Sequence, residues 1–321
     1  MKNSDFLSDW LNRPLPAKLW HYTSTQGFLG IIKSKAIFAT DSRFLNDHEE
    51  TVHAYRVARE LTQKISPKGR TKPLRQMRDV IDKAIVESEL LDGEMIRFFV
   101  VSFSEAEDQL SQWRGYSHGS SGVSLAFDLS KIKEEFDGAI LAPCAYAQND
   151  KEVLMESALK NLVAEYKKFR RITEQLMGET PYEPRKSSIE KYSDRIIDKA
   201  LQQSMPTFIH RGEESLKKIV QIAALLKNEE FREEREWRLI IPTNTPKQDW
   251  IDKVDFRANG TSLIPYMKAD LCRGSGDRLP LVDVILGPGS DDNGRLGSQL
   301  FLETQGISLE PKSSKVPYKP W

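Results

Sequence analysis

The residues best suited to chemistry lie in one short stretch, 233–242, which reads EEREWRLIIP. Side chains alternate between the two faces of a β-strand, so the pattern predicts a strand with one apolar and one polar face. Trp237, Leu239 and Ile241 would face the core. Two carboxylates on the polar face repel each other unless a cation or a sugar hydroxyl lies between them. The stretch therefore predicts a functional site that contains Glu234, Glu236 and Arg238.

A second candidate group lies near the N-terminus, where residues 19–23 read LWHYT and alternate in the same way. His21 and Thr23 share one face of this predicted strand, and Trp20 and Tyr22 share the other. A histidine beside a hydroxyl residue at a strand end can hold the sugar or amide of a ligand by hydrogen bonds. A histidine satisfied by the backbone is the plainer alternative.

Two further segments combine polar and aromatic side chains. Ser102, Phe103 and Ser104 end an apolar strand, and paired hydroxyls can brace a carboxylate; a strand running out into a loop is the alternative. The segment 109–119 contains Trp113 and Tyr116, which could stack on a planar ring beside the cation Arg114. Trp113 is more simply explained as a helix residue packed against the sheet, so Tyr116 is the better stacking candidate.

Several classes of site are excluded by spacing. His48 and His53 are five residues apart and do not share a helix face, which argues against a zinc protease. The chain contains no GxGxxG, GxxxxGK[ST] or GxSxG motif, so a Rossmann site, a P-loop and an α/β-hydrolase elbow are unsupported. Cys144 and Cys272 are far apart and form no CxxC motif, so we expect neither a disulfide framework nor a metal site.

Length and charge limit the class of protein further. The 321 residues carry 47 Lys and Arg against 47 Asp and Glu, and this balance argues against a general nucleic-acid or membrane binder. The length allows one elaborated domain or two domains. No apolar run is long enough for a signal peptide or a membrane span, so we expect a soluble, cytoplasmic protein without a membrane partner.

The elements that would position these residues follow from the apolar periodicity. Strands are predicted at 18–22, 36–40, 95–104, 123–127, 139–146, 235–241, 262–267, 282–286 and 307–309. Helices are predicted from Ser24 or Thr25, at 48–65, 74–91, 108–113 and 129–136, through most of 149–228, and at 296–303. We therefore predict a leader at 1–17, an α+β core at 18–148 and 230–311, a helical insertion at 149–229 and an extended tail at 312–321.

The order of these pieces resembles the ADP-ribosyltransferase superfamily, which uses a first-strand His or Arg, a middle hydroxyl or aromatic motif and a late Glu. The chain looks more closely like the bacterial domain-of-unknown-function family 2971. The residues that carry this resemblance are His21-Tyr22-Thr23, FLND at 44–47, VSFS at 101–104, Gln112-Trp113, 122–127, EREWR at 234–238 and ILGP at 285–288. It covers roughly 18–128 and 230–310 and skips the insertion.

The resemblance implies an α+β fold with a split, mostly antiparallel β core, flanking helices and a large helical insertion. It also implies an enzyme that cleaves NAD, as a toxin or anti-phage effector, and transfers ADP-ribose to an unidentified protein or nucleic acid. Glu236 would stabilise the cationic transition state, positioned by Ser102, and Glu234 would orient or deprotonate the acceptor. The implied NAD-binding set is His21, Tyr22, Thr23, Ser102, Phe103, Ser104, Trp113, Tyr116 and Arg238.

Two alternatives stay open at this stage. With water as the acceptor, the same fold would act as an NAD glycohydrolase. A non-enzymatic module for ligand sensing or interaction is the other alternative, and there Glu234, Glu236 and Arg238 would form a structural charge cluster. The first strand carries His21 where superfamily members with a Glu-x-Glu pair usually have Arg, so the signature is mixed.

Overall fold

The structure is a computed structural model that describes part of the chain. The described residues are 6–45, 56, 57, 60, 98–116, 122–130, 138–177, 218, 219, 221–243, 248–260, 262–272 and 278–318. Several sequence predictions therefore lie outside the described residues. They are Asn46 and Asp47, the helices at 48–65 (apart from 56, 57 and 60) and 74–91, the start of the third strand at 95–97, most of the helix at 129–136, and the part of the insertion at 178–217.

The chain divides into two compact units. One, the α6 unit, comprises 1–7, 49–96 and 147–226, and the other, the sheet unit, comprises 8–48, 97–146 and 227–321. The predicted insertion 149–229 thus falls in the α6 unit except for its last three residues, and this unit also takes 49–96, which we had assigned to the core. Helix α6 (Gln148–Met177) buries Leu154, Met155, Ala158 and Leu159, which form one apolar stripe. Within the described ranges, no helix has the length and apolarity needed to cross a bilayer.

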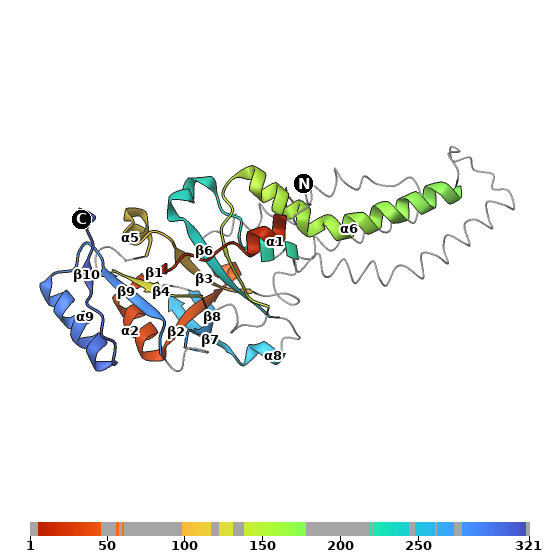
Figure 1. The fold of residues 1–321 in the computed structure, drawn as a ribbon. Helices are drawn as coiled ribbons and strands as arrows, with labels where there is room; N and C mark the ends of the chain where they lie inside the picture. The colour runs from red at the N-terminus through yellow and green to blue at the C-terminus, as the bar shows by residue number, and fades with distance from the viewer. Residues whose placement is uncertain are drawn as a thin grey trace. The chain divides into compact units, whose positions relative to one another are not determined.

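The sheet unit is built on a ten-stranded sheet (Figure 1). Its strands are β1 (Leu19–Ser24), β2 (Ala36–Asp41), β3 (Phe98–Ser104), β4 (Gly122–Phe127), β5 (Ile140–Pro143), β6 (Glu236–Pro242), β7 (Val254–Asn259), β8 (Ser262–Asp270), β9 (Leu281–Leu286) and β10 (Lys312–Ser313). The main order is β10-β9-β4-β1-β3-β2-β8-β7, and β6 joins β3 to β5. All of these pairings are antiparallel except that of β10 with β9. The predicted α+β class with a mostly antiparallel sheet is confirmed.

The sheet divides at β3. Strand β6 pairs with β3 along its whole length, from Phe98↔Pro242 to Ser104↔Glu236. The other edge of β3 has two partners: β1 pairs only at Ser104, opposite Trp20, and β2 pairs only at Val100 and Phe99. Ser102 lies between these two pairings. Along this edge of β3, the stretch between the pairing with β1 at Ser104 and the pairing with β2 at Val100 has no partner strand among the described residues. We call this place between β1 and β2 the seam, and Ser102 lies in it.

Helices cover both faces of the sheet. The remaining elements of the sheet unit are most of α1 (Phe6–Leu11), α2 (Thr25–Ser34), η1 (Ser42–Phe44), α5 (Leu110–Tyr116), η3 (Glu229–Glu234), α8 (Gln248–Ile251) and α9 (Asp292–Thr304). Phe28 of α2 and Leu302 of α9 pack into the larger apolar cluster, which contains Leu19, Phe99, Phe103 and Trp237. Trp113 of α5 packs on the opposite face with Trp20, Tyr22, Ala126 and Ile285. Each fully buried large side chain contributes about 1.5–3 kcal/mol to folding.

Four strand predictions differ from the structure. The strand predicted at 233–242 begins only at Glu236, because Arg235 adopts a left-handed conformation with φ of 44° and the preceding residues form η3. Residues 307–309 are not a strand. Gly306, with φ of 71°, ends α9, and the Ile307 N–H donates to the Leu302 carbonyl, so this amide caps the helix. The last strand, β10, instead lies in the predicted tail, and β7 was not predicted although Val254, Phe256 and Ala258 alternate with polar residues along it.

Candidate functional site

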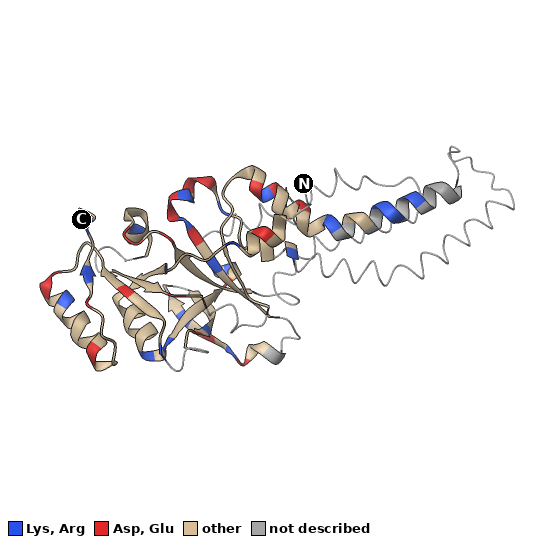
Figure 2. Ribbon diagram, viewed as in Figure 1, with Lys and Arg blue, Asp and Glu red and all other residues tan. Residues whose placement is uncertain are grey.

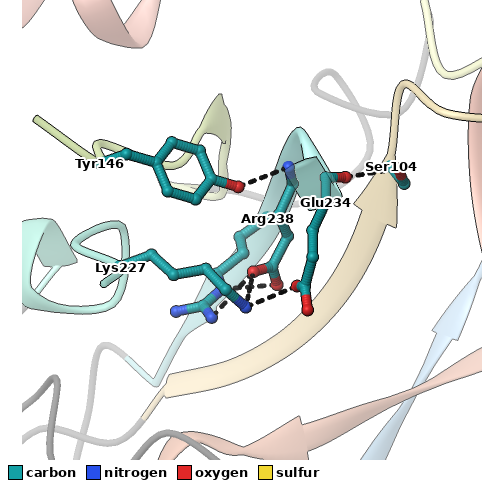
Figure 3. A network of polar contacts seen from close by, with 6 residues as sticks. Ser104, Tyr146, Lys227, Glu234 and Arg238 are labelled. Carbon is teal, nitrogen blue, oxygen red and sulfur yellow. Dashed lines mark hydrogen bonds and ion pairs between the residues drawn. The ribbon is translucent and has the colours of Figure 1, made fainter. Parts of the chain in front are cut away.

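Four charged side chains meet at the start of β6 (Figure 3). Arg238 donates Nε to Glu236 Oε1 at 2.8 Å and Nη2 to Oε2 at 3.0 Å. Lys227 Nζ lies 2.7 Å from Glu236 Oε2 and 2.8 Å from Glu234 Oε2. The side chains of Lys227, Glu236 and Arg238 are 2%, 5% and 5% exposed, and that of Glu234 is 13% exposed. We call these residues the four-charge cluster; its two cations balance its two carboxylates.

Backbone hydrogen bonds fix the cluster in place. The Glu236 N–H donates to the Tyr146 hydroxyl at 2.8 Å, and the Glu236 carbonyl accepts from the Cys144 N–H at 2.8 Å. The Ser104 hydroxyl donates to the Glu234 carbonyl at 2.5 Å. The Lys227 N–H donates to the Ala145 carbonyl at 3.0 Å. The end of β3, the segment after β5 and the start of β6 therefore hold the four side chains together.

The local sequence explains how Glu234 reaches Lys227 from outside the strand. Asn228 caps η3 by accepting a hydrogen bond from the Glu230 N–H at 3.1 Å, and η3 ends at Glu234. The left-handed Arg235 then turns the chain into β6. Figure 2 shows η3 in red and blue, whereas the central strands are mostly tan. Glu234 and Glu236 are thus neighbours as predicted, but a turn brings them together rather than a common strand face.

The charges of the cluster set its ionisation. Burial alone would raise the pKa of Glu236, but Arg238 and Lys227 outweigh it and lower this pKa to about 2. Burial likewise disfavours the charged form of Lys227, yet the attraction of Glu236 and Glu234 outweighs both burial and Arg238, so its pKa is raised. Desolvation and then the nearby carboxylates of Glu236 and Glu234 raise the pKa of Tyr116 to about 12. Glu236 and Lys227 are therefore both charged at neutral pH.

His21 lies in the seam rather than in the cluster. Its Nδ1 is 2.9 Å from the Ser102 carbonyl oxygen, so Nδ1 carries the proton and donates. Its ring packs edge-on against Phe103, with centroids 5.9 Å apart. The register places Trp20, Ser104 and Glu236 on one face, so the alternation directs His21 toward the other face. Among the described residues, no hydrogen bond or ion pair joins His21 to the four-charge cluster.

Three aromatic residues of the implied NAD-binding set belong to the core. Phe103 is 2% exposed and Trp113 is 1% exposed. Tyr22 is 6% exposed and packs edge-on against Trp113 at 4.8 Å, and its hydroxyl donates to the Ala106 carbonyl at 2.8 Å. Tyr116, at the end of α5, is 37% exposed. Tyr116 is therefore the member of these four whose ring has surface available for stacking on a ligand.

The hydroxyl residues of β3 differ from their implied roles. Ser104, and not Ser102, lies opposite Glu236, while Ser102 lies opposite Arg238. The Ser104 hydroxyl binds backbone groups: it donates to the Glu234 carbonyl and accepts from the Ala106 N–H at 3.0 Å. Thr23, at the end of β1, is half-buried beside Gly27. Ser104 therefore supports the backbone around the site, and among the described residues no hydrogen bond joins Ser102 or Ser104 to the Glu236 carboxylate.

Sequence reasoning missed two residues of the site. Lys227 follows the apolar run 222–226. A single cation at the end of an apolar run was the one sequence feature that could have indicated this residue. Tyr146 lies just beyond β5, where the predicted strand 139–146 ended. Lys227 precedes the EREWR motif at 234–238 without being part of it, and Tyr146 lies in no motif. In the described part of the chain, no group of three or more His, Cys, Asp or Glu residues is arranged to hold a metal ion.

The fold and the site together define a mixed α+β protein with a divided, mostly antiparallel sheet and a buried ion-pair cluster beside β3. Residues 112–239 match the model of a family described as "Protein of unknown function (DUF2971)". This match supports the family resemblance and includes Tyr146 and the whole four-charge cluster. It runs through 149–229, which the resemblance had skipped, and leaves His21 and Ser102 outside. No curated protein and no solved structure matches the chain.

Proposed function

We propose that this protein is an NAD-dependent ADP-ribosyltransferase that cleaves the nicotinamide–ribose bond and passes ADP-ribose to a macromolecular acceptor. One observation carries the proposal. The three motifs of the resemblance lie on adjacent strands, β1, β3 and β6, and Trp20, Ser104 and Glu236 form one row across them. Tyr116, at the end of α5, is partly exposed and could contact a ligand.

The cluster suits the proposed chemistry because positive charge develops on the ribose as nicotinamide leaves with the electron pair of the C1′–N bond. A buried, ionised carboxylate at Glu236 would stabilise that charge. Both oxygens of Glu236 are engaged by Arg238 and Lys227. In the reaction, the ribose 2′-hydroxyl would replace Lys227 on Oε2, and Lys227 would keep its contact with Glu234. Glu234 would take the proton of the acceptor as its nucleophile bonds to C1′.

The test is incubation of the protein and a cell lysate with NAD labelled in the adenylate part, followed by separation of proteins from nucleic acids. We expect label on one macromolecular fraction and a loss of at least about 100-fold for Glu236→Gln. Glu233→Gln is the matched control, because Glu233 is an exposed carboxylate close by in sequence. Thermal melting of each variant separates loss of activity from loss of fold. Full activity in Glu236→Gln would refute the mechanism.

The internal neutrality of the cluster favours a second candidate, in which its four charges have a structural role in a non-enzymatic module. Calorimetry with millimolar NAD separates the two: absence of binding favours the structural role. Free ADP-ribose without any labelled macromolecule would instead identify an NAD glycohydrolase. We also propose a toxin or anti-phage role, in which expression of the wild type slows bacterial growth and expression of Glu236→Gln does not.

A further inference from the structure

The outer edge of β7 is an open strand edge at one end of the sheet. Strand β7 pairs with β8 and, among the described residues, with no other strand (Figure 1). The side chains of residues 255–258 are exposed, and Phe256 itself is 55% exposed. An edge strand that carries an exposed aromatic side chain is a template for pairing with a strand of another chain.

The other ends of the sheet are less suited to pairing. Strand β10 has only two residues. Strand β5 has four, of which Leu141 and Ala142 are fully buried, and the carbonyl of its last residue, Pro143, accepts from Trp10 Nε1 at 2.9 Å. In the described part of the sheet, β7 is therefore the end strand that combines length with exposed side chains.

A proline shows which backbone groups of β7 point outward. Phe256 lies opposite Pro265 of β8. The two residues of a hydrogen-bonded antiparallel pair exchange both N–H···O bonds, and a proline has no N–H to donate. The N–H and carbonyl of Phe256 therefore point away from β8, and the alternation along the strand gives Val254 and Ala258 the same direction. Consistently, the Phe256 N–H donates to Asp255 Oδ1 at 2.8 Å.

Two opposite charges flank Phe256 along the strand. Asp255 accepts from the Tyr266 hydroxyl at 3.0 Å, and Arg257 donates Nη2 to the Thr40 hydroxyl oxygen at 3.0 Å. These contacts with neighbouring strands hold both side chains on the face opposite to Phe256. A guanidinium has five N–H donors, and the contact with Thr40 uses one. Arg257 therefore keeps donors for a carboxylate of another chain.

We propose that β7 pairs antiparallel with β7 of a second copy of this chain, about a two-fold axis that passes between the two Phe256 residues. The outward groups of Phe256 then bond to Phe256 of the second copy, and those of Val254 bond to Ala258 of the second copy. The symmetry places Asp255 of each copy opposite Arg257 of the other copy. Cross-strand pairs of aromatic residues and of opposite charges both stabilise a sheet, and the same surface serves both copies.

The charges select this register over its neighbours. An axis shifted by one residue would place either Asp255 or Arg257 opposite its own counterpart in the second copy, and like charges directly opposite each other are destabilising. Pairing also leaves no backbone donor unsatisfied. The Asp255 carboxylate exchanges the Phe256 N–H for the guanidinium of the second copy, and the released N–H bonds to the new strand.

Sedimentation velocity of the full chain tests the pairing. One edge strand per copy buries less than a standard interface of about 1,200–2,000 Å², so we expect a dimer that dissociates on dilution from about 300 to about 1 µM. Asp255→Arg and Arg257→Asp should each weaken dimerisation by about tenfold or more, because each variant opposes like charges twice. Lys33→Asp, at an exposed lysine of α2, makes the same charge change as Arg257→Asp and should leave the dimer unchanged.

A mixture of the two charge variants tests the register. In an equimolar mixture of Asp255→Arg and Arg257→Asp, one chain carries two cations and the other two carboxylates at these positions. A mixed dimer regains both ion pairs and should form about as readily as the wild-type dimer. A mixture of Asp255→Arg with Lys33→Asp has the same net charges and should form mixed dimers less readily, which separates strand pairing from general charge attraction.

Phe256→Pro is a second test that leaves the contacts of Asp255 and Arg257 in place. Proline removes an outward N–H but none of the β7–β8 bonds, so the variant should melt close to the wild type and remain monomeric. Thermal melting identifies any charge variant that loses its fold, and Phe256→Pro then decides. The inference is refuted by a monomeric wild type at every concentration, by a dimer that survives Phe256→Pro, or by folded charge variants that stay monomeric when mixed.

Discussion

Lys227 and Glu236 form a buried ion pair that closes the loop before β6. The two residues are nine apart in the sequence, and Lys227 Nζ lies 2.7 Å from Glu236 Oε2. Lys227 is also the shared partner of Glu234, so a single ammonium group neutralises the repulsion between the two carboxylates. Breaking a buried pair leaves an uncompensated charge, and this cost usually exceeds the net stabilisation that the pair provides.

Lys227→Met should therefore destabilise the protein strongly. The substitution keeps an apolar stem of similar length but leaves Glu234 and Glu236 with Arg238 as the remaining cation of the cluster. We expect a loss of about 3–5 kcal/mol in the free energy of unfolding, measured by urea denaturation at pH 7. Lys253→Met, at an exposed lysine, is the control and should change stability by less than about 0.5 kcal/mol.

Restoring the charge balance should recover part of this loss. In the double variant Lys227→Met/Glu234→Gln, one carboxylate, Glu236, faces one cation, Arg238, at the observed 2.8 Å. We expect the double variant to be more stable than Lys227→Met, although it changes two side chains that are in contact, so that their effects on stability are not additive. A double variant that is less stable than Lys227→Met would show that the cluster contributes through packing rather than through charge balance.

The pH dependence of stability should carry the signature of Glu236. The ordinary pKa of a glutamate carboxyl is 4.5, and the pKa of Glu236 in the folded protein is about 2. A lowered folded pKa gives stability that is present above the unfolded pKa and is lost as the pH falls toward the folded value. Between about pH 5 and about pH 3 this group should lose about 2 kcal/mol of its contribution. The free energy of unfolding of Glu236→Gln, measured by denaturation at several pH values in the same window, should fall less steeply with pH than that of the wild type. An equal fall would contradict the assignment.

Tyr146→Phe should destabilise the site without changing its charge. The Tyr146 hydroxyl accepts the Glu236 N–H at 2.8 Å, and its removal leaves a backbone donor unpaired beside a buried carboxylate. We expect a loss of about 1–3 kcal/mol by urea denaturation. Tyr318→Phe is the matched control, since none of the described hydrogen bonds uses the Tyr318 hydroxyl, and it should change stability by less than about 0.5 kcal/mol.

The sequence predicted most strands because each follows a local rule. The alternation in β6 identified Trp237 and Leu239 as core and Glu236 and Arg238 as the polar face, and the structure has this arrangement. The apolar run 98–101, directly before Ser102, likewise identified β3. In contrast, the position of Glu234 depends on Arg235 adopting a left-handed conformation, which is rare for a residue other than glycine and leaves no sequence signal.

Partners that only the folded chain brings together were beyond sequence reasoning. Lys227 meets Glu236 because η3 folds the chain back, and Arg257 meets Thr40 across 217 residues through two strand pairings. The sequence also could not tell which serine of β3 lies opposite Glu236, since Ser102 and Ser104 share a face and the register of β3 with β6 decides between them. Register and tertiary closure, rather than local propensity, therefore determine the site.

We expect that stability requires a glycine at position 27, where β1 meets α2, because the Thr23 side chain leaves no room for a Cβ there. A Cβ added at Gly27 would lie 2.0 Å from the Thr23 hydroxyl oxygen, so Gly27→Ala forces Thr23 or the helix start to move. We expect a loss of about 1–3 kcal/mol, measured by urea denaturation. Gly30→Ala, in the same helix and with no atom within 4 Å of the added Cβ, is the control and should stabilise by about 0.5–1 kcal/mol.

The partner substitution tests whether the clash is the cause. Thr23→Ala removes the hydroxyl oxygen, and in the double variant Gly27→Ala/Thr23→Ala most of the loss should disappear, with an interaction energy of at least about 1 kcal/mol in the double-mutant cycle. The Ser24 side chain, which accepts from the Gly27 N–H at 3.1 Å, keeps its capping role in every variant. Strictly additive losses would show that the added Cβ does not clash with the Thr23 hydroxyl.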